Sequence, residues 1–215
     1  MPKRGRSLLT WQAGLWAGGS LVLILGALAI VFLTGAPSTE TATLPQVTAS
    51  DISYGPEGAP VVVMEYADFQ CEACARFAPM LAALRAKYGD KVRFVFRFFP
   101  LANHPYGMLS AQVAYAASLQ GKFWEMHDLL YERQKEWSDA ADPSPYFEAY
   151  AKSLGLDMTQ FREDLNAQAT KDLITSQMAE GSDAGVNHTP WFTVNDTVLV
   201  PNEIGDFEAL IEAGL

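Results

Sequence analysis

Hydrophobic and polar positions along the chain predict strands and helices in turn after residue 50. Residues 61–66 form a short apolar, β-branched run, which indicates a buried strand. Over 71–88 the apolar positions recur at spacings of three and four, which predicts a helix with a kink at Pro79. A second strand is predicted over 92–99, where apolar side chains occupy alternate positions.

The pattern is helical over 105–180 and returns to strands after Gly185. The predicted helices of this block span 108–119, 123–137, 145–154 and 159–178. Two strands follow at 191–194 and 197–200, and a final helix has an apolar face made by Phe207, Leu210, Ile211 and Leu215. The order strand–helix–strand, helical block, strand–strand–helix predicts an α/β core that carries a helical insertion.

The first 34 residues follow a different pattern, which predicts a membrane anchor. Residues 13–33 carry no formal charge, and a helix of 21 residues spans roughly 30 Å, the hydrocarbon thickness of a bilayer. The alternative is a cleaved secretory signal, but its apolar region is usually only about 7–15 residues long. Lys3, Arg4 and Arg6 should stay in the cytoplasm by the positive-inside rule, which places the body outside it.

Composition and charge narrow the classes of function. Of the 215 residues, 49% are hydrophobic and 19% charged, which excludes a disordered or collagen-like protein. The formal net charge is −10, so the basic surface that nucleic-acid binding needs is absent. Residues 35–50 are rich in Thr, Ser, Ala and Pro and show no helical period, so we expect a flexible linker there.

The only two cysteines, Cys71 and Cys74, are the candidate chemical centre. They are three residues apart, where the predicted strand and its loop give way to the predicted helix. The N-terminal end of a helix lowers the pKa of a thiol. Cys71 is therefore suited to attack a disulfide as a thiolate or, when it is itself part of a disulfide, to be the sulfur that is attacked. Cys74, one turn further on, is placed to resolve the mixed disulfide.

Three other interpretations of this pair compete with redox exchange. A structural zinc site needs four ligands, and the sequence has neither a second CxxC pair nor a histidine at a recognisable ligand spacing. A structural disulfide here would close a very short loop, for which the entropic stabilisation is small. The location at a strand-to-helix junction argues against an incidental pair of buried thiols. We therefore expect a redox-active pair and no metal.

Four segments together resemble DsbA-like thiol–disulfide oxidoreductases with a thioredoxin fold, in particular their membrane-anchored bacterial branch. The resemblance covers about residues 51–215. It rests on EYADFQCEAC at 65–74, on FFPL at 98–101 with His-Pro at 104–105, on QGKFWEMHD at 120–128 and on GVNHTP at 185–190. It implies a thioredoxin-like core with an inserted helical domain, preceded by one transmembrane helix. The implied divisions are anchor 1–34, linker 35–50, first half of the core 51–103, helical insertion 104–182 and second half of the core 183–215.

The resemblance also implies roles for individual residues. Cys71 corresponds to the nucleophile and Cys74 to the resolving cysteine. Thr189 and Pro190 correspond to a cis-proline loop that faces the disulfide and binds an extended substrate peptide. Glu65 corresponds to a buried acid that helps proton transfer to the inner cysteine. Independently, a glutamate near the end of an apolar strand should be partly desolvated, which raises its pKa.

The dipeptide between the cysteines, Glu72-Ala73, is expected to tune the redox balance. A carboxylate roughly 6 Å from a thiolate costs about 0.7 to 2.8 kcal/mol, depending on the effective dielectric constant. The helix end opposes this by about 0.3–1 kcal/mol at an exposed site. Because neither effect clearly dominates, we expect Cys71 to be less acidic than in relatives with a neutral or cationic residue at position 72, and the protein to be a moderate oxidant.

The sequence therefore predicts an exported thiol–disulfide oxidoreductase that oxidises cysteines of secreted polypeptides through Cys71 and Cys74. A quinone-linked membrane partner would reoxidise it, and no cofactor is expected. The alternatives are an extracytoplasmic disulfide reductase or isomerase, for example in cytochrome maturation, and a tethered peptide-binding chaperone. The sequence does not fix the direction of electron flow, because that depends on which redox state the site stabilises.

Overall fold

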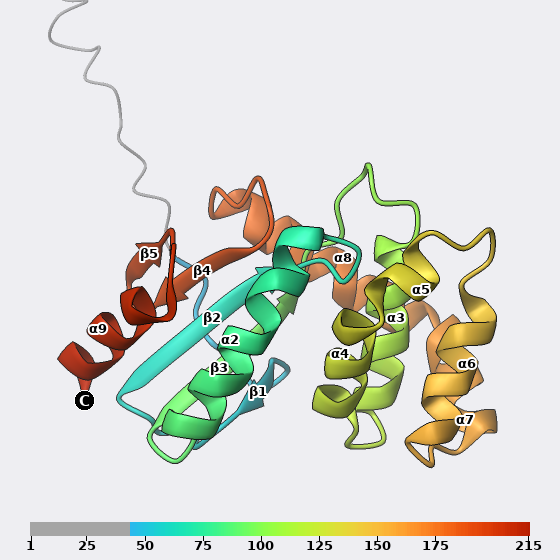
Figure 1. Ribbon diagram of the computed structural model, residues 1–215, viewed down its shortest axis with the longest axis horizontal. Coiled ribbons are helices and arrows are strands. Elements are labelled where there is room, and N and C mark those ends of the chain that lie inside the picture. Colours follow the sequence, from blue (N-terminus) through green and yellow to red (C-terminus); the bar gives the residue numbers. More distant parts are fainter. Residues whose placement is uncertain (1–43) are drawn as a thin grey trace, which may run out of the picture. The chain divides into compact units, whose positions relative to one another are not determined.

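The fold of the described residues, 44–215 of this computed structural model, is built on a five-stranded mixed sheet (Figure 1). Its strand order is β1-β3-β2-β4-β5. The strands are β1 (Ile52–Tyr54), β2 (Val61–Ala67), β3 (Val92–Phe98), β4 (Trp191–Val194) and β5 (Thr197–Leu199). Strand β3 runs parallel to β2, whereas β1 lies antiparallel to β3 and β4 antiparallel to β2. A parallel pair needs a crossover connection, which α2 (Glu72–Tyr88) provides.

A block of helices separates β3 from β4 in the chain. Its helices are α3 (Gly107–Ser118), α4 (Phe123–Glu132), α5 (Gln134–Ser138), α6 (Ser144–Ser153), α7 (Met158–Asn166) and α8 (Gln168–Asp183), and α9 (Ile204–Gly214) follows β5. In Figure 1, α3 to α7 gather to one side of the sheet and α8 runs back toward it. The helix predicted over 123–137 is divided between α4 and α5 at Arg133. The helix predicted over 159–178 is divided between α7 and α8, because Ala167 adopts an extended conformation.

Both faces of the sheet are buried. On one face, α2 and α9 contribute Leu81, Leu84, Phe207 and Ile211, which pack on Val63 and other strand residues. On the other face, Met64, Tyr66 and Val95 pack with Trp191. Leu215 is 50% exposed, so the predicted apolar face of the last helix does not extend to it.

A buried arginine on β3 joins the sheet to the segment before β1. Arg97 is only 1% exposed, and its guanidinium donates to both carboxylate oxygens of Asp51 at 2.8 Å. It also donates to the Gln46 carbonyl at 2.7 Å and to the Tyr66 hydroxyl at 2.9 Å. A buried charge needs such partners, since an unpaired one costs several kcal/mol. Among residues 44–215, no helix is long and apolar enough to cross a bilayer. The anchor predicted at 13–33 lies outside the described residues.

Candidate active site

The cysteine pair lies at the junction between β2 and α2. Cys71 is the N-cap of α2 and has an extended backbone, so its sulfur is at the end of the helix with the unpaired N–H groups. Cys74 is fully buried in the first turn, and Cys71 is nearly so. Both thiols are free in this structure, which therefore shows the reduced form.

The Thr189–Pro190 loop faces this pair from the opposite end of the sequence. The Cys71 thiol donates to the Thr189 carbonyl, with 3.4 Å between sulfur and oxygen, across 118 residues of chain. The Thr189–Pro190 peptide bond is cis, as the resemblance implied. The loop reaches this position because Trp191, directly after it, begins β4 and pairs with Tyr66 of β2.

The pKa of Cys71 is lowered from 9.0 to about 5. The hydrogen bond from the Cys74 thiol contributes most, and burial opposes it. The Thr189 side chain, whose hydroxyl is buried, lowers the pKa further, as do the N–H groups of Cys74 and Ala73. Glu72 is exposed and is not among the main influences. Of the two opposing effects on the Cys71 pKa, the helix end therefore dominates over Glu72, because the exposed carboxylate is screened by water.

Two buried groups beside Cys71 favour their protonated forms. Burial raises the pKa of Cys74 well above its usual value, and the nearby Glu65 and Cys71 add to the effect. Burial also raises the pKa of Glu65 from 4.5 to about 8, partly opposed by the Arg85 guanidinium. Glu65 lies on β2 with β3 and β4 on either side, and its Oε1 has no hydrogen-bond partner in the described structure. The desolvation of Glu65 that the sequence predicted is confirmed.

Asp68, to which the sequence assigned no role, joins the loop before Cys71 to the loop after β3. The residue is only 1% exposed, and its carboxylate accepts from the backbone N–H groups of Gln70 at 2.7 Å and Leu101 at 2.8 Å. His104 Nδ1 is 2.7 Å from Asp68 Oδ2. Gly107 packs closely against this carboxylate. A residue with a side chain would be crowded at this position, because its Cβ would lie only 3.0 Å from Oδ2. The only sequence signal was the place of Asp68 inside the motif at 65–74.

Gln134 is a second positioning residue that sequence reasoning missed. It begins α5, and its buried amide donates to the carbonyls of Phe69 at 2.7 Å and Cys71 at 3.0 Å. These bonds hold the loop that presents Cys71 against the helical block. No sequence signal pointed to it, because a single glutamine in a charged segment carries no pattern.

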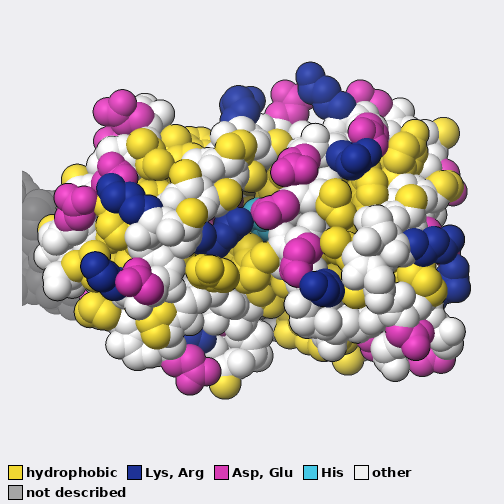
Figure 2. Space-filling view, turned by 60° about the horizontal axis from the view of Figure 1, so that its bottom comes forward, with side chains coloured by type: hydrophobic (Ala, Val, Ile, Leu, Met, Phe, Trp, Pro, Cys, Tyr) yellow, Lys and Arg dark blue, Asp and Glu magenta, His cyan; other side chains and the backbone are white. Residues whose placement is uncertain are grey.

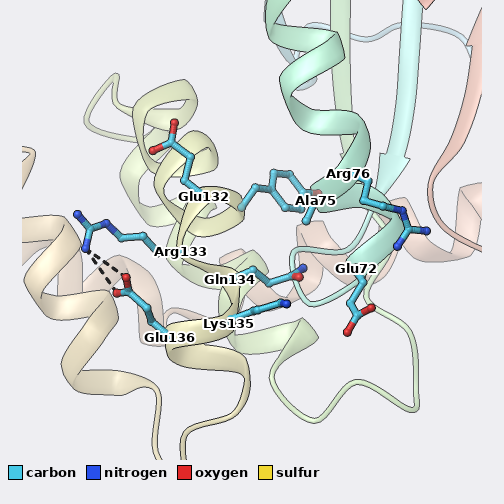
Figure 3. Close-up of a pocket in the computed structure, with 9 residues that line it drawn as sticks. Glu72, Ala75, Arg76, Glu132, Arg133, Gln134, Lys135 and Glu136 are labelled. Atoms are coloured by element: carbon cyan, nitrogen blue, oxygen red, sulfur yellow. Dashed lines mark hydrogen bonds and ion pairs between the residues drawn. The ribbon is translucent and has the colours of Figure 1, made fainter. Parts of the chain in front are cut away.

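Two open hollows lie at the start of α2. One, of about 470 Å³, is lined by Cys71, Ala73, Arg76, His104 and Asp139 among others. The second, of about 500 Å³, lies between the start of α2 and the α4–α5 turn (Figure 3). There, Arg76 and Glu72 on α2 lie across from Gln134 and Lys135, and Arg133 is paired with Glu136 at 3.5 Å. Figure 2 shows charges of both signs interspersed with hydrophobic side chains over the face that it presents.

The arrangement is suited to thiol–disulfide exchange. An acidic thiol that borders an open hollow can attack a disulfide or leave from one, while a fully buried thiol next to a buried acid can be activated once the first has reacted. Within residues 44–215, no cluster of three His, Cys, Asp or Glu side chains could hold a metal ion.

The sequence matches known proteins over most of its described part. A family model described as Thioredoxin matches residues 47–213. The Na+/H+ antiporter NhaA 3 of Salinispora tropica is 41% identical over 142 residues, which is 66% of this chain but 21% of that protein. NhaA of Herminiimonas arsenicoxydans is 34% identical over 161 residues, 72% of this chain and 25% of that protein. The chain thus spans about a fifth to a quarter of the length of these relatives.

Solved structures agree in fold. α-DsbA1 of Wolbachia pipientis has a TM-score of 0.68 at 20% identity, covering 80% of this chain and 94% of that one. BdbD of Bacillus subtilis, in its oxidised form, has a TM-score of 0.67 at 21% identity, covering 76% and 92%. A thioredoxin-like oxidoreductase of Silicibacter pomeroyi has a TM-score of 0.66 at 23% identity, covering 82% and 97%. At these identities the likeness establishes a thioredoxin-like α/β fold.

Proposed function

The chain belongs to the thioredoxin family, and on that premise we propose that it is a thiol–disulfide oxidoreductase that oxidises cysteines of exported polypeptides. The observation that carries the proposal is that the two thiols differ in acidity and in access to solvent. Cys71 is acidic and borders an open hollow, whereas Cys74 is buried and holds its proton. This is the division of roles that a nucleophile and a resolving cysteine require.

In the oxidising direction, a substrate thiolate attacks Cys71 of the Cys71–Cys74 disulfide. The bond between the two enzyme sulfurs breaks, and Cys74 leaves with the electron pair and takes up a proton, for which Glu65 is the nearby acid. A second substrate thiolate then attacks the substrate sulfur of the mixed disulfide and expels Cys71 as a thiolate. The substrate has lost two electrons, and the enzyme has gained them. The carbonyl of Thr189 lies beside Cys71, where it can bind the backbone of the substrate peptide.

The acidic Cys71 favours the oxidant over a reductase or isomerase. A pKa of about 5 stabilises the reduced form at pH 7 by about 2–3 kcal/mol over one with an ordinary thiol, which raises the reduction potential by about 40–60 mV. We expect the full-length chain to have a potential higher than that of an ordinary dithiol by this amount and to oxidise a reduced, unfolded polypeptide. Glu72→Gln, an exposed control, should change the potential little. A potential at or below that of an ordinary dithiol would support the reductase instead.

We propose that residues 13–33 anchor the chain in the cell membrane with the catalytic domain on the extracytoplasmic side, where a quinone-linked membrane protein reoxidises it. The support is the length of the uncharged segment and the basic residues before it. The full-length chain should remain with membranes after alkaline extraction, and its release into the soluble fraction would refute the anchor. Ion transport is not proposed, because the match covers only about a fifth of the antiporter relative.

A further inference from the structure

The hydrogen bonds of Asp68 fix the tautomer of His104. Asp68 Oδ1 accepts from the backbone of Gln70, and Oδ2 accepts from the backbone of Leu101. A carboxylate that accepts at both oxygens is an acceptor for Nδ1 as well, so His104 Nδ1 carries the hydrogen and donates it at 2.7 Å. In the neutral ring, Nε2 is then the basic nitrogen with a free lone pair.

The basic nitrogen lies on the side of the ring away from the buried carboxylate. The His104 side chain is 21% exposed, whereas the Asp68 carboxylate is completely covered. His104 lines the hollow of about 470 Å³ that also contains Cys71. Among residues 44–215, no protein atom is hydrogen-bonded to Nε2. His104 therefore combines a nitrogen that has no hydrogen-bond partner among these residues with a place in the lining of the hollow that contains Cys71.

We propose that His104, oriented by Asp68, accepts the proton of the substrate cysteine thiol as that sulfur attacks Cys71. The inference rests on the proposed function and adds a catalytic residue to it. An ordinary thiol is mostly protonated at neutral pH and is a poor nucleophile until it loses its proton. Neutral imidazole is the side chain best suited to accept a proton in that range.

The proposed step is balanced in atoms and electrons. The substrate S–H bond breaks and its proton moves to Nε2, while the sulfur forms a bond to Cys71 Sγ and the Cys71–Cys74 bond breaks. The electron pair of that bond leaves on Cys74. The Asp68 carboxylate at 2.7 Å stabilises the imidazolium that forms, and the proton then passes to solvent through the open side of the hollow.

Other charged groups line the same hollow. The pH dependence of the reaction rate of the native protein therefore reflects these groups as well as His104. Besides the Asp68 carboxylate, these groups are Cys71, Glu72, Arg76 and Asp139. A variant that removes the base and keeps the hydrogen bond to Asp68 isolates its contribution. His104→Asn meets this need, because the asparagine amide offers an N–H near the position of Nδ1 and has no counterpart of Nε2.

The experiment measures the second-order rate at which the oxidised full-length chain oxidises a synthetic peptide with two cysteines, as a function of pH. Near pH 6–7 the His104→Asn variant should be slower by about 100-fold, the low end of the contribution of a positioned base. The gap should close above about pH 9, where the peptide thiol is already ionised. The reduction potential and the pKa of Cys71 should be unchanged in the variant.

Each other outcome has a defined meaning. A gap of equal size at every pH would show that His104 only positions the loops, and the absence of a gap would show that it does not contribute; both overturn the inference. Native protein that oxidises the peptide at no pH would overturn the proposed function itself. Should His104→Asn not fold, native protein must still show a solvent deuterium isotope effect near pH 6 that disappears above about pH 9. Its absence would overturn the inference.

Discussion

In a Cys74→Ala variant, mixed disulfides between Cys71 and substrate polypeptides should accumulate, whereas a Cys71→Ser variant should form none and lose exchange activity completely. The reason is the burial of Cys74, which leaves Cys71 as the sulfur that a substrate can reach. Without Cys74, the adduct on Cys71 has no intramolecular thiol to resolve it. Non-reducing gels of cells that express each variant measure the adducts, which should disappear when reductant is added.

The Cys74→Ala variant should also show a higher pKa for Cys71. The hydrogen bond from Cys74 is the largest influence that lowers this pKa, and alanine cannot donate it. Titration of the ultraviolet thiolate absorbance should therefore give a midpoint above that of the native protein, which is about 5. Folded, exported Cys74→Ala protein without adducts would contradict the assigned roles, and so would adducts on the Cys71→Ser variant.

Replacement of Glu65 with glutamine should stabilise the protein in alkaline solution and change its stability little in acid. Glu65 has a pKa of about 8 in the folded protein and 4.5 when exposed. Below pH 4.5 both states bind the proton. Between pH 4.5 and 8 only the folded state retains it, so the stability due to this proton decreases as pH rises through that window. Glutamine does not titrate and should remove the loss, which we expect to be about 5 kcal/mol at full extent.

Urea unfolding of native and Glu65→Gln protein at about pH 5 and pH 8.5 tests this expectation, with both proteins in the reduced form. Cys71 acts with the opposite sign, because its pKa is lower in the folded state, so stability is gained as pH rises from about 5 toward 9. That contribution is common to both proteins and largely cancels in their difference. Glu72→Gln, at an exposed position of the same site, is the matched control. Parallel pH curves for native and Glu65→Gln protein would show that Glu65 keeps an ordinary carboxyl pKa.

The sequence predicts most of the elements that position the cysteine pair. The apolar run at 61–66, the helix over 71–88 and the alternation over 92–99 correspond to β2, α2 and β3. These predictions succeed because each element buries a face whose period is visible locally. β1 was missed, since three residues are too few to show a period. The break at Ala167 was missed because Gln112 of α3 stabilises it, donating to the Leu165 carbonyl at 2.8 Å.

The candidate site was predictable only where a local motif exists. Cys71, Cys74 and the cis bond before Pro190 lie in short motifs, and the burial of Glu65 follows from its strand. Asp68 contacts Leu101 and His104, which are 33 and 36 positions further along the chain. Contacts at such separations produce no periodic pattern or motif spacing in the sequence. Buried polar residues satisfy partners that are distant in the chain, so their roles become visible only in the folded structure.

The unequal proton affinities of the two cysteines also set the proton stoichiometry of each turnover. Between about pH 5 and pH 8 the reduced pair carries one proton, on Cys74, because Cys71 remains a thiolate. An ordinary substrate dithiol gives up two protons when it is oxidised, so one proton is released to the medium. The equilibrium constant for oxidising such a substrate therefore rises about tenfold per pH unit in this range, equivalent to about 30 mV. A lower pH of the surrounding medium would therefore make the protein a weaker oxidant toward dithiol substrates.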